Sequence, residues 1–174
     1  IAFHSPPLER ETEITGPSAA KLFISSSTTD ADIFVVLRVF SSDGDEVVFQ
    51  GAIDPHTPIA QGWLRASHRM LDLELSSFYR PYHAHREKQP LRADEIVELD
   101  IEIWPTSIVI PAGYRIAVTV RGKDYEYPGS SGRIASFKNE LRGCGPFLHN
   151  DTRDRPPKIF AGKTTLHTAP HRDC

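Results

Sequence analysis

Short segments in which apolar and polar residues alternate dominate the chain, and no stretch keeps a helical apolar repeat over several turns. The clearest is segment 95–104, where every second residue is aliphatic and most residues between them are acidic. Since alternate side chains of a strand point to opposite faces, this pattern predicts a strand with one dry and one wet face. We therefore expect Leu99 and Ile101 in the core, and Asp100 and Glu102 toward water.

Other segments have the same character and are separated by turn residues, among them 14 prolines and 11 glycines. Segment 33–37 is apolar at every position, which predicts a strand covered on both faces at the centre of a sheet. Turns are expected at 42–45 and 111–113, where Gly and Pro favour tight reversals. The further strands that we predict are 21–25, 33–40, 46–49, 61–66, 114–121 and 158–168. About eight short strands predict an all-β protein, a sandwich of the jelly-roll type.

Two long stretches, 67–94 and 122–157, lack regular alternation and are longer than the loops that compact domains usually contain. One or two helical turns are expected at 70–77 and at 133–142.

The second long stretch is rich in aromatic residues. Tyr125, Tyr127, Phe137 and Phe147 are interleaved there with Gly and Pro, and Trp104 ends the clearest strand. We predict that these five residues contact a second domain or a second copy of the chain. The alternative is that the four rings of the loop cap the domain's own core, where large apolar side chains usually lie.

Length, charge and apolar run lengths narrow the class of protein. With 174 residues the chain is expected to form one domain, 1–174. A net charge of -3 and scattered basic residues argue against nucleic-acid and membrane-surface partners. The apolar runs are far shorter than the roughly 20 residues that cross a bilayer. The chain begins with Ile and reads as a fragment, and its two cysteines favour a reducing, cytoplasmic location.

Known catalytic motifs are missing. The nucleophile elbow G-x-S-x-G of α/β-hydrolases does not occur, and Gly129–Gly132 has the wrong spacing for it. His83 and His85 share one side of an extended segment, but positive neighbours and the lack of a third ligand argue against a metal.

Two further groups are weak candidates for chemistry. Cys144, His149 and Asp151 do not have metal-motif spacing and are expected to be ordinary loop residues. The acid pairs 30/32 and 43/45 lack the alternation of a calcium loop and are interpreted as solvated turn acids. We predict no catalytic residue, no metal ligand and no cofactor in this chain.

Four ordered blocks, 12–17 (TEITGP), 21–44, 62–69 (GWLRASHR) and 99–122, carry a resemblance to a known family. Together they resemble the C-terminal domain of the X-prolyl dipeptidyl-peptidase and cocaine esterase (CocE/NonD) family of serine hydrolases. The resemblance implies a galactose-binding-like jelly roll attached to an α/β-hydrolase domain that carries the catalytic Ser, Asp and His.

The resemblance also implies a role. The chain would pack on the hydrolase domain of the same polypeptide, help to wall off its substrate cleft and, in some members, support a homo-oligomer. The parent would act on acyl esters or amides, X-Pro peptides included. The long stretch 122–157 departs from the peptidases, and the chain ends where family members continue into another strand.

One alternative from another class stays open. A free-standing carbohydrate-binding module would present exposed rings, for which Trp63, Trp104, Tyr125 and Tyr127 are candidates. Trp63 is expected in the core or an interface, because tryptophan is usually highly buried.

Overall fold

Strands make up nearly all of the regular structure in the computed structural model, which describes residues 1–50, 56–125 and 163–168. In these residues the regular elements are β1 (Ala2–His4), β2 (Thr12–Ser26), β3 (Asp32–Phe40), β4 (Glu46–Val47), β5 (Ala60–Arg65), the 3-10 turn η1 (Ala66–His68), β6 (Val97–Ile110), β7 (Arg115–Arg121) and β8 (Thr164–His167). No helix of the described part is long and apolar enough to cross a membrane.

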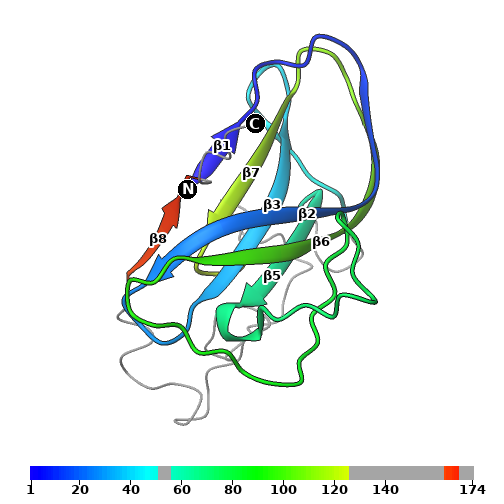
Figure 1. Cartoon of the computed structure of the whole chain (residues 1–174). Helices are drawn as coiled ribbons and strands as arrows, with labels where there is room; N and C mark the ends of the chain where they lie inside the picture. The colour runs from blue at the N-terminus through cyan, green and yellow to red at the C-terminus, as the bar shows by residue number, and fades with distance from the viewer. Residues whose placement is uncertain (51–55, 126–162, 169–174) are drawn as a thin grey trace, which may run out of the picture.

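The strands form two antiparallel sheets that pack face to face (Figure 1). One sheet has the order β1-β7-β3-β4, with β5 also paired to β3, and the other has the order β6-β2-β8. The expected all-β sandwich is confirmed. The strand at 33–40 is central, as predicted, and Ile33–Leu37 are all buried.

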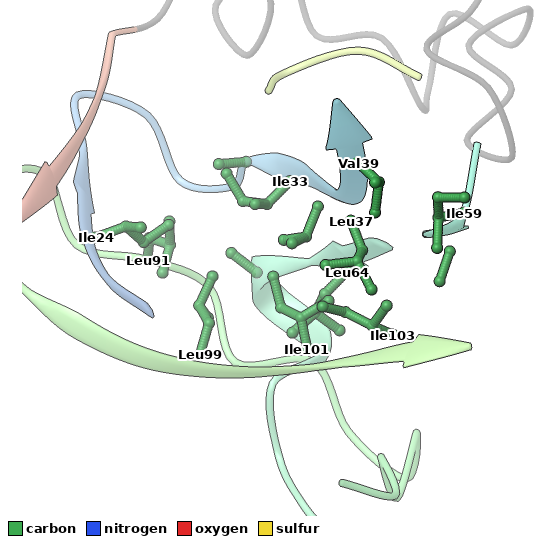
Figure 2. Packing of buried hydrophobic residues seen from close by; sticks show 14 of the residues in the cluster. Ile24, Ile33, Leu37, Val39, Ile59, Leu64, Leu91, Leu99, Ile101 and Ile103 are labelled. Atoms are coloured by element: carbon green, nitrogen blue, oxygen red, sulfur yellow. The ribbon is translucent and has the colours of Figure 1, made fainter. Parts of the chain in front are cut away.

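The core lies between the sheets, and its buried strand residues come from β2, β3, β5 and β6 (Figure 2). Leu99 and Ile101 of β6 have no exposed surface, and Figure 2 shows Ile101 next to Leu37 and Leu64 of the other sheet. Asp100 and Glu102 lie on the opposite face, partly exposed, so the predicted register is confirmed.

Several boundaries differ from the sequence prediction. β2 begins at Thr12 rather than at 21, and β6 continues past Trp104 to Ile110, because the two strands pair along most of their length. Gly16 has a φ of 106° and lies at a bulge inside β2.

The other turns and loops follow the prediction more closely. Gly44 and Gly113 have positive φ in the predicted turns 42–45 and 111–113. The segment 70–77 contains no helix but has one helical-type turn, in which the backbone N–H of Ser76 donates to the carbonyl of Asp72 at 3.0 Å. The strand expected at 158–168 is β8, described from Thr164.

Candidate domain interface

Two tryptophans meet where an edge strand of one sheet approaches an edge strand of the other. Along β5, Ala60, Gly62 and Leu64 are buried and the residues between them point outward, which leaves Trp63 half-buried. Trp104 lies on the outer face of β6 and is 55% exposed. The two ring centroids are 4.9 Å apart and the planes are tilted by 53°, a favourable aromatic geometry.

Gly62 makes this approach of β5 and β6 close. A Cβ atom added at Gly62 would lie 1.8 Å from the backbone oxygen of Glu102. Only glycine therefore lets the two edges approach to this distance. The sequence analysis gave this residue no role, because nothing in the local pattern of β5 indicates a neighbour 40 residues away.

A hollow of about 330 Å³ opens beside Trp63 and is lined by Trp63, Leu64, Arg65, His68, His83 and His85. Arg65 is fixed by a two-pronged ion pair with Asp32, in which the nitrogen–oxygen distances are 2.7 and 2.9 Å. The carboxylate of Asp30 accepts hydrogen bonds from the backbone N–H and the hydroxyl of Ser67. These contacts hold β5 and η1 in place, so the interpretation of Asp30 and Asp32 as solvated turn acids is wrong.

Three histidines meet at the hollow. Nδ1 of His68 lies 3.0 Å from Nδ1 of His85, so one ring must donate a proton that the other accepts. His85 holds a backbone φ of 51°, a conformation that non-glycine residues rarely adopt. His83 is half-buried, and its Nε2 has no hydrogen-bond partner among the residues that the structure describes.

Burial lowers the pKa of His68 and of His83, and the neighbouring His85 lowers both further. Lys88 and Arg65 act on the pKa of His68 in the same direction, against Asp30. For His83, a hydrogen bond with the backbone of Asp100 and the charges of Asp100 and Glu102 act in the opposite direction. The neutral forms of His68 and His83 are thus favoured.

Residues Asp72–Tyr82, which we call the arm, extend from the sandwich between η1 and β6 (Figure 1). The backbone N–H of Asp72 donates to the carbonyl of Tyr82 at 2.8 Å, which closes the base of the arm. Arg80 in the arm contacts Glu102 on the outer face of β6 at 3.4 Å. The arm therefore lies on the same side of the molecule as Trp104.

The structure places the predicted interface residues in different environments. Trp104 is exposed, and its role in an interface stays a prediction. Tyr125 is half-buried, and its hydroxyl donates to Glu46 at 3.0 Å, which ties it to the domain's own first sheet. Tyr127, Phe137 and Phe147 lie outside the described residues. So do Gly129–Gly132 and the group Cys144, His149 and Asp151.

The described residues contain one serine–histidine contact, which the sequence analysis missed. Ser25 Oγ lies 2.9 Å from Nε2 of His167, across the pairing of β2 and β8. No carboxylate is recorded on this histidine within the described part of the chain, and a Ser-His-Asp site requires one to orient the ring. No group of three potential ligands that could hold a metal occurs in the same residues.

Comparisons with known proteins agree on one family. The family profile described as "X-Pro dipeptidyl-peptidase C-terminal non-catalytic domain" matches residues 1–173. Two curated proteins named as candidate serine esterases, Mb1866c of Mycobacterium bovis and MT1883 of Mycobacterium tuberculosis, are each 30% identical over 153 residues. That match covers 84% of this chain and 21% of each relative.

A solved structure shows the same architecture. The CocE/NonD family hydrolase SACOL2612 of Staphylococcus aureus is 31% identical, with a TM-score of 0.71 over 78% of this chain and 25% of that protein. The chain thus spans about a fifth to a quarter of the length of these relatives.

Proposed function

Because the chain belongs to the family of X-Pro dipeptidyl-peptidase C-terminal non-catalytic domains, we propose that it packs on the catalytic domain of a serine hydrolase and helps to shape the substrate cleft. The catalytic Ser, Asp and His would lie in that other domain of the same polypeptide. The parent enzyme would hydrolyse acyl esters or X-Pro peptide bonds.

The observation that carries this proposal is the exposed tryptophan face beside the hollow. Trp104 is 55% exposed next to Trp63, although the sandwich has a closed core of its own. Large aromatic residues are more frequent in interfaces than on the rest of a protein's surface, and their burial stabilises association. A domain packed over a cleft also excludes water from it, which strengthens the electrostatic interactions inside.

The experiment uses the full-length enzyme with a protease site introduced between the two domains. After cleavage, the two pieces are expected to co-elute in size-exclusion chromatography and to keep the ester KM of the uncleaved enzyme. Separation of the pieces with unchanged kinetics would contradict both the packing and the role in the cleft.

The chain alone is expected to hydrolyse neither p-nitrophenyl esters nor X-Pro anilides above the buffer rate. Serine catalysis needs a base and an orienting acid within hydrogen-bond reach, and Ser25–His167 lacks the acid in the described part of the chain. Turnover that survives repurification and disappears in Ser25→Ala would contradict the non-catalytic role.

The same tryptophan face leaves one alternative function. An exposed Trp104 ring, packed on a Trp63 that lines a hollow with Arg65 and three histidines, could stack on a sugar, as in a carbohydrate-binding module. Quenching of tryptophan fluorescence by oligosaccharides, abolished in Trp104→Ala, would favour this alternative. Quenching absent across a panel of plant and bacterial polysaccharides would favour domain packing.

A further inference from the structure

The arm carries an unusual number of exposed apolar side chains for a segment of 11 residues. The exposed fractions are Leu73 83%, Leu75 62%, Phe78 96%, Tyr79 53% and Tyr82 47%. Single exposed apolar residues are common on protein surfaces, but five within 11 residues are unusual, and exposed apolar patches mark interaction sites. Phe78 and Tyr79 contact each other edge to face at 6.2 Å, so they form one aromatic projection.

The arm keeps a defined conformation without burying these side chains. Ser77 and Arg80 exchange two backbone hydrogen bonds, of 3.0 and 3.1 Å, around the aromatic pair. The hydroxyl of Ser76 accepts from the backbone N–H of Tyr82 at 2.9 Å and donates to its carbonyl at 3.2 Å. Hydrogen bonds between polar groups thus hold the loop, and the apolar side chains remain available for a partner. Compact loops of this kind, with their ends close together, often carry function.

Two ion pairs connect the arm to the rest of the domain, one at its base and one to β6. Asp72 binds Arg86 at 2.8 Å, and its carboxylate accepts from the backbone N–H groups of Glu74 and Leu75. Arg80 contacts Glu102, two residues before Trp104 on β6. Arg80, which follows the aromatic pair, thus brings the arm to the strand that carries Trp104.

We infer that the arm is the element that docks this domain, with Phe78 and Tyr79 inserted into an apolar pocket on the catalytic domain of the same polypeptide. This inference rests on the proposed function and names the surface that performs it. A domain on the same chain meets the arm at a high effective concentration, unlike a second copy. The chain spans only about a fifth to a quarter of its relatives, so most of their length is available to supply that pocket. Aromatic anchors that become fully buried against the partner are typical of interface centres.

The test repeats the cleavage experiment on the full-length enzyme with the double variant Phe78→Ser/Tyr79→Ser. The cleaved pieces are expected to separate, with an affinity at least tenfold weaker than in the wild type. Phe3→Ser is the matched control: Phe3 is also exposed, at 52%, but lies on β1, at the opposite edge of its sheet from β5. Pieces carrying this control are expected to stay together.

A second measurement does not depend on weakening the interface. In the uncleaved enzyme, a thiol introduced by Phe78→Cys is expected to react with a maleimide at least tenfold more slowly than one introduced by Phe3→Cys, with labelled peptides identified by mass spectrometry. Equal labelling rates would contradict docking through the arm. So would a double variant whose cleaved pieces stay together as the wild-type pieces do. In both cases the proposed function would still stand. Wild-type pieces that separate would overturn both.

The isolated domain supplies the remaining outcome. Analytical ultracentrifugation is expected to find that the aromatic pair does not cause self-association. The inference would be overturned if the isolated domain formed a dimer that Phe78→Ser/Tyr79→Ser abolished, while the same variant left the cleaved pieces of the full-length enzyme together. The arm would then bind a second copy of the chain.

Discussion

Apolar side chains are buried in the core between the two sheets but exposed to solvent in the arm. Leu99 and Ile101 have no exposed surface, and strand pairing satisfies the backbone around them. Leu73 and Phe78 are 83% and 96% exposed, and hydrogen bonds within a short loop hold the backbone that carries them. Burial stabilises the first region within the domain. The second region reaches comparable burial only against a partner, so the two should respond differently to substitution.

The largest effect is expected for Leu99→Ala in the core. Removing a fully buried leucine side chain leaves a cavity between the sheets and should lower the free energy of unfolding by about 2–5 kcal/mol. Urea unfolding of the isolated domain measures this change. Val109→Ala is the matched control, since Val109 lies on the same strand but is 59% exposed. A greater loss from Asp100→Ala than from Leu99→Ala would reverse the register of β6.

Gly62→Ala should cost somewhat less, about 1–3 kcal/mol, because the new methyl group forces β5 away from β6. The change also separates the Trp63–Trp104 pair, which shifts tryptophan fluorescence. Gly122→Ala is the control, as a Cβ there meets nothing within 4 Å. Equal melting temperatures for the two variants would mean that the edges do not approach as closely as described.

A smaller, pH-dependent effect is expected at the hollow between the core and the arm. The pKa of His68 and of His83 is lower in the folded protein than the ordinary value of 6.5, chiefly because of burial. The unfolded chain therefore binds more protons below pH 6.5. Stability from these rings is complete above that pH and is lost as the pH falls from 6.5 through the lowered values.

Unfolding midpoints in urea between pH 7.5 and 5 measure this dependence. The double variant His68→Gln/His83→Gln should show a shallower decline than the wild type, since glutamine keeps hydrogen-bonding groups without titrating. Identical profiles for the two proteins would place the pH dependence elsewhere.

The smallest effect on stability is expected in the arm. Phe78 is 96% exposed, so Phe78→Ser should change the free energy of unfolding of the isolated domain by less than about 0.5 kcal/mol. Calorimetry of the domain checks this value. A loss of more than 1 kcal/mol, well above the usual effect of a surface substitution, would show that the ring packs within its own domain and would remove the contrast with Leu99.

Local pattern was sufficient to predict the sandwich class, the register of β6 and the central position of β3. Alternation alone assigns Leu99 and Asp100 to opposite faces, since a one-residue shift would expose the whole apolar set. The turn at 42–45 was also predictable from its glycine, because Gly44 adopts a positive φ that other residues rarely adopt. The four ordered blocks further indicated the family.

The surface that we propose as the interface follows from the tertiary structure and not from the local sequence pattern. Tyr125, predicted at an interface, is tied to Glu46, whereas the arm, whose sequence suggested helical turns, presents the exposed residues. The Gly62 contact, the histidine cluster and the Trp63–Trp104 pair join residues between 17 and 41 positions apart in sequence. Such contacts depend on how the two sheets and the long loop pack in space, and periodicity describes only the direction of each side chain along its own strand.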